Sequence, residues 1–237
     1  MGILTLLATS HIAVGQRDVA DEAALGLEFK TMVFAAQSQR SARAAEDDGP
    51  LIPELPDLYY YDGSNHILVE FLVNQMSSNY VYSGDEAFDF FTQEVNAEGE
   101  LEYRRAFRVN VNGSWRSALV VMLPTTDAER PFKLFAVDTS PENLATGTIK
   151  VFNLSNEPVV LNADGEIYPL YSMGAVELDI SGIEKNRLPV ALALKEDEGF
   201  KLVYRRVWSM RSSVRGIYFI YTLNDDLRHW YMRNIIL

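Results

Sequence analysis

The side chains that most often carry out catalysis or bind metals are scarce or widely spaced in this sequence. The 237-residue chain has no cysteine, and its three histidines, His11, His66 and His229, lie far apart. A histidine metal site needs ligands at strand or helix spacing, such as His-x-His, and no such pair occurs. The serine in Asn112–Trp115 lacks a Gly-x-Ser-x-Gly elbow and is typical of a turn. The sequence therefore predicts no catalytic residue, no metal site and no cofactor.

Acidic side chains keep one enzymatic alternative open. Glycoside hydrolases use two carboxylates that flank the scissile bond, and this chain has 33 Asp and Glu residues. Paired acids such as Asp47-Asp48, Asp85-Glu86 and Asp225-Asp226 fall in predicted turns, where solvated carboxylates are expected. A hydrolase with acids in a cleft between two domains is therefore the less favoured alternative.

Tyrosines on two predicted strands are the candidates for ligand binding. Tyr59, Tyr60 and Tyr61 are consecutive, whereas Tyr80 and Tyr82 alternate with other residues. Side chains of a strand alternate between its faces, so Tyr60 must leave the face that Tyr59 and Tyr61 share. Outward rings could stack on sugars or on another protein. The favoured alternative is that the rings fill the core, the sheet rim and the domain interface, because sheets favour aromatic residues for packing alone.

A Tyr-Arg-Arg sequence occurs once in each half of the chain, as YRRAF and YRRVW. An arginine between aromatic residues can stack on them and pair with an acid on the neighbouring strand. Because the sequence recurs, we interpret it as a feature of the fold, with ligand binding as the minority interpretation. The structural residues of this prediction are Tyr103, Arg105, Phe107, Tyr204, Arg206 and Trp208.

Short apolar segments separated by turn residues predict an all-β protein. The clearest turn is Asn112-Gly113, because both residues tolerate the positive φ of a type I′ hairpin. Strands roughly ten residues apart are typical of a sandwich or barrel. Trp115-Arg116 and its apolar run also recur, as Val214-Arg215 and its run. Matches in an unchanged order predict two copies of one fold, with Tyr103 over Tyr204 and Phe107 over Trp208 on equivalent faces.

This repeated order predicts two similar antiparallel β-sandwich domains in tandem, of an immunoglobulin-like kind. We expect a leader and short N-terminal segment at residues 1–26, a first domain at 27–137, a linker at 138–147 and a second domain at 148–237. Residues 37–56 end in PLIPELP, whose prolines oppose a helix or central strand, and are predicted to be a surface insertion. The short linker should make the domains share apolar surface, with a ligand groove between them.

Two segments carry a resemblance to a known family. Residues 146–153 (TGTIKVFN), preceded by residues 135–140 (FAVDTS), resemble the domain joint in a family of uncharacterised bacterial β proteins. The Tyr-x-Tyr-x-Gly sequence at residues 80–84, followed by residues 88–91, is similar to the first domain of that family. The resemblance covers most of residues 27–236, although the predicted insertion departs from it. It implies two β domains and export, and it implies no activity.

Charge and the N-terminal sequence bear on partners and location. The net charge is −12, from 21 Lys and Arg against 33 Asp and Glu, and such a chain repels nucleic acid. Residues 1–16 contain no Asp, Glu, Lys or Arg and include the small-x-small sequence Ala13–Gly15, as in an export signal without its basic start. A buried N-terminal strand or helix is the alternative. No other segment approaches the roughly 18 apolar residues of a membrane span.

These observations predict a periplasmic or secreted protein that is not an enzyme and that binds an unidentified protein or glycan, or serves as a structural module. A carbohydrate-binding protein that uses exposed Tyr and Trp is the alternative. We expect neither nucleic acid nor a membrane span in the mature chain.

Overall fold

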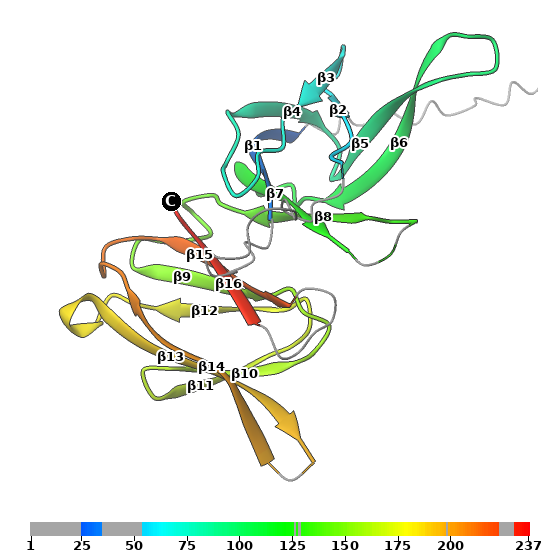
Figure 1. Ribbon diagram of the computed structural model, residues 1–237. Helices are drawn as coiled ribbons and strands as arrows, with labels where there is room; N and C mark the ends of the chain where they lie inside the picture. The colour runs from blue at the N-terminus through cyan, green and yellow to red at the C-terminus, as the bar shows by residue number, and fades with distance from the viewer. Residues whose placement is uncertain (1–24, 35–53, 126, 128, 198, 223–229) are drawn as a thin grey trace, which may run out of the picture.

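The computed structural model describes residues 25–34, 54–125, 127, 129–197, 199–222 and 230–237. Within these residues the regular structure is β throughout, apart from one short 3-10 helix, η1 (Glu184–Asn186). Sixteen strands form four four-stranded sheets in two groups of two (Figure 1). The predicted all-β class with two tandem β-sandwiches is therefore confirmed. Most of the predicted N-terminal segment (1–26) and most of the predicted insertion (37–56) lie outside the described residues, and residues 25 and 26 already belong to the first strand.

The N-terminal sandwich contains the first eight strands. One of its sheets has the order β4-β1-β7-β8 and the other has the order β3-β2-β5-β6. All pairings are antiparallel except the parallel pair of β1 and β7. The strands are β1 (Leu25–Val33), β2 (Leu58–Tyr61), β3 (His66–Val69), β4 (Tyr80–Gly84), β5 (Ala87–Val95), β6 (Leu101–Asn110), β7 (Ser117–Pro124) and β8 (Phe132–Asp138).

The C-terminal sandwich repeats this strand order. Its sheets run β12-β9-β15-β16 and β11-β10-β13-β14, and the pair of β9 and β15 is again parallel. Each strand thus takes the place of the strand eight positions earlier, as two copies of one fold would give. The strands are β9 (Thr148–Asn153), β10 (Val159–Ala163), β11 (Glu166–Leu170), β12 (Ala175–Asp179), β13 (Arg187–Glu196), β14 (Gly199–Ser209), β15 (Gly216–Thr222) and β16 (Trp230–Ile236).

The predicted hairpin at Asn112-Gly113 is wrong. These residues connect β6 to β7, which lie in different sheets, and neither residue is among those with positive φ. The Asn112 side chain instead accepts a hydrogen bond from the Ser114 amide at 2.9 Å, which closes a local turn. A positive-φ pair does occur at Asp164-Gly165, between the paired strands β10 and β11. Turn chemistry alone therefore did not show which strands pair.

The repeated Tyr-Arg-Arg segments lie in equivalent strands, but their tyrosines face opposite ways. In β6 a bulge falls between Arg105 and Phe107, after the tyrosine, whereas in β14 it falls between Leu202 and Tyr204, before it. A bulge adds one residue and reverses the alternation of faces beyond it. Tyr103 consequently lies on the outer face of its sheet, and Tyr204 packs against the C-terminal core. The prediction of equivalent faces is wrong for the tyrosines.

Phe107 and Trp208, at the end of the same motif, do face the core of their own sandwich. Phe107 packs against the N-terminal core, and Trp208 is only 4% exposed in the C-terminal core. Both residues follow the bulge of their strand, so the alternation of faces is the same for both from there on.

A third apolar cluster joins the two sandwiches. In β7, Leu119 and Val121 belong to this cluster, whereas their neighbours in sequence point into the N-terminal core. In β15, Phe219 takes the same role, and its ring lies 4.9 Å from that of Phe34. Strands buried on both faces carry continuous apolar runs, as both of these do. The predicted sharing of apolar surface between domains is confirmed, and the four sheets stack as four layers (Figure 1).

Within the described residues, no helix has the length and apolar character needed to cross a membrane.

Candidate functional site

Three of the five predicted ligand-binding tyrosines are core residues. Tyr60 is 4% exposed and Tyr82 is 7% exposed, and Tyr80 is half-buried against the same core. The hydroxyl of Tyr60 donates to the carbonyl of Val81 at 2.9 Å, and that of Tyr82 donates to the carbonyl of Asp85 at 3.0 Å. The low exposure of Tyr60 and Tyr82 contradicts a surface role for these two rings, and Tyr80 is only partly buried, because the alternation of β2 and β4 turns all three toward the core.

Burial also fixes the ionisation of these phenols. Desolvation raises the pKa of Tyr60 and of Tyr82 above the ordinary value for tyrosine. Both hydroxyls are therefore neutral hydrogen-bond donors at physiological pH. This suits a packing role and leaves them no part in chemistry at the surface.

The other two tyrosines belong to a cluster of rings on the outer face of the sheet β3-β2-β5-β6. We call this cluster the aromatic face, and it consists of Tyr59, Tyr61, His66, Phe91 and Tyr103. Tyr59 pairs with Phe91 and Tyr61 pairs with His66 across neighbouring strands, so each pair projects to the same side. Tyr61 is 44% exposed, and the other rings are half-buried against one another.

The rings of the aromatic face contact one another at short distances. The His66 and Tyr103 rings stack with centroids 3.7 Å apart and planes 4° apart. Tyr59 meets Tyr103 edge-on at 5.2 Å, and Phe91 meets His66 edge-on at 5.1 Å. Desolvation lowers the pKa of His66, which keeps the imidazole neutral near pH 7. The face is thus an uncharged, pre-packed group of rings.

Polar groups border the aromatic face along β5 and β6. Arg105 lies opposite Phe91 in the register, and its Nη1 is 3.8 Å from Asp89 Oδ2. The guanidinium of Arg108 pairs with the same carboxylate, with Nε 2.6 Å from Oδ1. The predicted pairing of Arg105 with an acid on the neighbouring strand is therefore present. Charged hydrogen-bond donors and acceptors lie beside the rings, where they could form hydrogen bonds with the hydroxyl groups of a ligand.

The aromatic face was only partly evident from sequence. Tyr59 and Tyr61 follow from strand alternation, but Tyr103 was assigned a structural role in the motif, and neither His66 nor Phe91 was predicted. The bulge in β6 is what brings Tyr103 to this face. Alternating aromatic residues in the neighbouring strands could have indicated Phe91.

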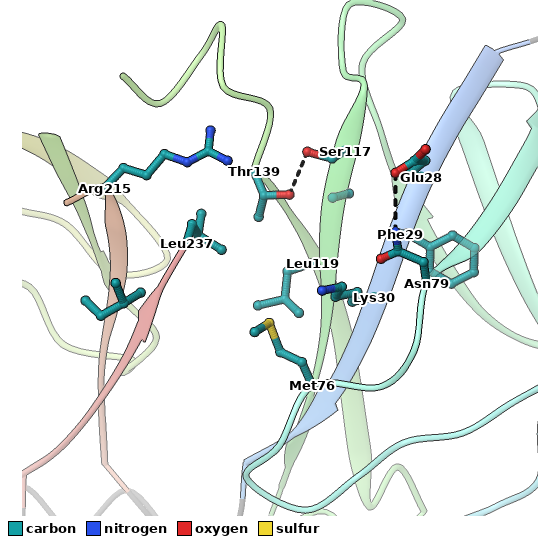
Figure 2. A pocket seen from close by; sticks show the side chains of 12 residues that line it. Glu28, Phe29, Lys30, Met76, Asn79, Ser117, Leu119, Thr139, Arg215 and Leu237 are labelled. Carbon is teal, nitrogen blue, oxygen red and sulfur yellow. Dashed lines mark hydrogen bonds between the residues drawn. The ribbon is translucent and has the colours of Figure 1, made fainter. Parts of the chain in front are cut away.

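A second candidate site is a pocket of about 350 Å³ between the sandwiches (Figure 2). Its walls come from β1, β7, Thr139 and the segment before β4 on one side, and from the residue before β15 and the end of β16 on the other. The lining residues are Glu28, Phe29, Lys30, Met76, Asn79, Ser117, Ala118, Leu119, Thr139, Arg215, Ile236 and Leu237. The predicted interdomain groove therefore exists, although none of these residues was predicted.

Polar side chains converge in this pocket from both sandwiches. Figure 2 shows the guanidinium of Arg215 extended toward Thr139 and Ser117. The Thr139 hydroxyl donates to Ser117 Oγ at 3.0 Å, and Asn79 Nδ2 donates to Glu28 Oε2 at 3.3 Å. Nη1 of Arg215 is buried and has no hydrogen-bond partner among the described residues. A buried charged donor in this state destabilises the ligand-free protein.

The acidic and histidine side chains do not gather into a metal-binding group in the part of the chain that is described. Among these residues, no group of three or more His, Asp or Glu could hold a metal ion. Glu28 is the single acidic side chain among the residues that line the interdomain pocket, whereas a glycoside hydrolase uses two. His11 and His229 lie outside the described residues.

The motif residues of the C-terminal sandwich mostly pack in its core. Trp208 stacks on Tyr218 with centroids 4.1 Å apart, and its Nε1 donates to the Tyr204 hydroxyl at 3.2 Å. Desolvation raises the pKa of Tyr218 to about 12 and raises that of Tyr204 as well. Arg206 is exposed and, with Arg205, borders a shallow hollow over β10, β13 and β14.

No protein-family model matches this chain, and no curated protein matches it.

Proposed function

We propose that this protein is a non-enzymatic binding protein that holds a carbohydrate on its aromatic face. The observation that carries this proposal is the contact between five rings on the outer side of one sheet, with Tyr61 44% exposed. One face of a pyranose ring presents C–H groups, which pack on the π-face of an aromatic ring. A flat sheet surface suits an extended chain of such sugars better than a deep pocket would.

The polar border supports the same ligand class. Hydroxyl groups of a sugar both donate and accept hydrogen bonds, and Asp89 and Arg105 offer an acceptor and donors beside the rings. Because the rings already contact one another, little side-chain freedom would be lost when a ligand binds. The proposed ligand is therefore a neutral polysaccharide or oligosaccharide.

Export belongs to this proposal. The apolar N-terminus with a small-x-small sequence at Ala13–Gly15 supports transport to the periplasm or the medium, as does the family resemblance. Extracellular and cell-wall polysaccharides would be met there. Cell fractionation followed by mass determination of the mature N-terminus tests export, and an intact Met1 in the cytoplasm would oppose it. The immunoglobulin-like assignment of the sandwiches stays a prediction.

The decisive experiment is a glycan array followed by titration of any retained oligosaccharide. Tyr61→Ala should weaken binding by about tenfold, because losing roughly 1.4 kcal/mol of ring contact changes an affinity by that factor. Tyr171→Ala is the matched control, since this tyrosine is 71% exposed in the other sandwich and lies outside the aromatic face. Retention of no glycan, or equal effects of the two substitutions, would reject the carbohydrate proposal.

A further inference from the structure

The pocket between the sandwiches is lined by cationic side chains from both sandwiches. Arg215 and Lys30 line it with two cations, and Glu28 is the single acidic side chain among its lining residues. The Glu28 carboxylate accepts a hydrogen bond from Asn79. Arg215 precedes β15 and Lys30 lies in β1, so each sandwich contributes one cation that an anion could pair with. This site lies apart from the aromatic face, and the inference does not depend on the proposed function.

One nitrogen of the Arg215 guanidinium is buried, and the side chain extends toward the hydroxyl groups of the pocket (Figure 2). Nη1 of Arg215 is removed from solvent and has no hydrogen-bond partner among the described residues. Guanidinium groups present parallel N–H donors that match the two oxygens of a carboxylate, and such charge-assisted bonds are stronger than neutral ones. A carboxylate in the pocket would pair with the guanidinium where it extends toward Thr139 and Ser117 (Figure 2).

The hydrogen-bonded hydroxyl groups of Thr139 and Ser117 supply a second contact for the same anion. Thr139 donates to Ser117 Oγ, and this arrangement leaves the Ser117 hydroxyl proton available to a ligand. Figure 2 shows that the Arg215 side chain extends from the C-terminal sandwich toward these two hydroxyls of the N-terminal sandwich. An anion at this point would contact both sandwiches at once.

The rest of the pocket is apolar. Met76 is 36% exposed and Ile236 is 45% exposed, and the two residues line the pocket from opposite sandwiches. A pocket of about 350 Å³ is within the range of small-molecule sites and holds more than a single bound water. The ligand should therefore have an apolar part next to its charged group.

We propose that this pocket binds a small organic carboxylate. Its carboxylate pairs with Arg215 and accepts from the Ser117 hydroxyl, and its apolar part lies against Met76 and Ile236. Binding would join the two sandwiches more firmly, because the ligand contacts residues of both.

The test uses hexanoate as the probe, with hexanol and inorganic phosphate as the arms that separate charge from apolar contact. Calorimetric titration of the full chain should show saturable hexanoate binding, with a dissociation constant on the order of 1 mM. In methyl NMR spectra, the Met76 methyl signal should shift with the same dependence on concentration. Hexanol and phosphate should each bind at least about tenfold more weakly, since each lacks one half of the recognised ligand.

Arg215→Met provides the discriminating variant, since it keeps an unbranched side chain and removes the charge. It should weaken hexanoate binding at least about tenfold, while the melting temperature stays unchanged or rises because a buried N–H group without a hydrogen-bond partner among the described residues is gone. Arg116→Met is the matched control, since Arg116 is the sequence counterpart of Arg215, is exposed, and is not among the residues that line the pocket. It should leave hexanoate binding unchanged.

Three outcomes would overturn the proposal. Hexanoate could fail to saturate, Arg215→Met could bind it as tightly as the original chain, or hexanol or phosphate could bind as tightly as hexanoate. If Arg215→Met does not fold, the Met76 methyl signal in the original chain decides, because the absence of a saturable shift there rejects the site. The aromatic face takes no part in these measurements, so failure of the carbohydrate proposal would be seen separately.

Discussion

Trp208 is the best-packed aromatic residue of the repeated motif, and its contacts predict a large stability effect. Its ring is 4% exposed, stacks on Tyr218 at 4.1 Å and donates a hydrogen bond to Tyr204. Trp208→Ala should lower the free energy of unfolding by about 3–5 kcal/mol, as truncation of a buried aromatic side chain does. Urea denaturation measures this, with the exposed Tyr171→Ala as a control expected within about 0.5 kcal/mol of the original chain. A loss below about 1 kcal/mol for Trp208→Ala would contradict the packing described.

His66 gives the aromatic face a dependence on pH. Burial lowers its pKa below the ordinary 6.5, so the unfolded chain binds a proton at a higher pH than the folded chain does. Stability contributed by the neutral ring is therefore present above pH 6.5 and decreases as the pH falls toward the lowered pKa. Urea midpoints measured between about pH 8 and 5 should show this decrease, and His66→Phe, which keeps a ring, should flatten it. An unchanged pH profile in His66→Phe would contradict the assignment.

Strand alternation explains which element-level predictions succeeded. It predicted that Tyr60 leaves the face of Tyr59 and Tyr61, and the structure has Tyr60 in the core and Tyr61 exposed. It did not predict the orientation of Tyr103, because the bulge in β6 adds a residue without any glycine or proline to indicate it. The residues Asn112-Gly113 also did not show which strands pair on either side of them. Strand pairing depends on which side chains are buried across the whole sandwich.

The hairpin between β10 and β11 offers a direct test of backbone conformation. Gly165 has a φ of +91°, and a Cβ added there would meet nothing within 4 Å. Gly165→Ala should therefore destabilise by about 1 kcal/mol through backbone strain alone, because L side chains rarely adopt this conformation. Gly182→Ala is the control, since it has equal space and no positive φ, and it should change stability by less than about 0.5 kcal/mol. Equal losses measured by thermal denaturation would show that strain is not the cause.

For the whole molecule, sequence predicted the number of sandwiches and their shared apolar surface, but it did not predict the residues of the pocket. The internal repeat and the short linker can be recognised from local patterns in a single sequence. Arg215 and Lys30 line one pocket only because the sheets with β7 and β15 pack face to face, and that docking depends on side chains from both sandwiches. The continuous apolar runs of these two strands are the sequence signal of that docking. A strand with one solvent-exposed face would instead alternate apolar and polar residues.

The shared apolar cluster predicts that the two sandwiches unfold together. Phe219 is fully buried at their junction, where its ring lies 4.9 Å from Phe34 and 6.0 Å from Phe135 of the other sandwich. Phe219→Ala should cost about 3–5 kcal/mol and should also weaken the coupling between sandwiches. In calorimetry, the original chain should show one transition, and the variant should show two or one much broader transition.

Phe200→Ala is the matched control, because this phenylalanine is 66% exposed in β14, away from the junction. It should keep a single transition with nearly the original midpoint. Tryptophan fluorescence and methyl signals in each sandwich identify which part unfolds first. If the original chain already shows two separate transitions, the junction does not couple the sandwiches, and a ligand in the pocket between them would stabilise neither one through the other.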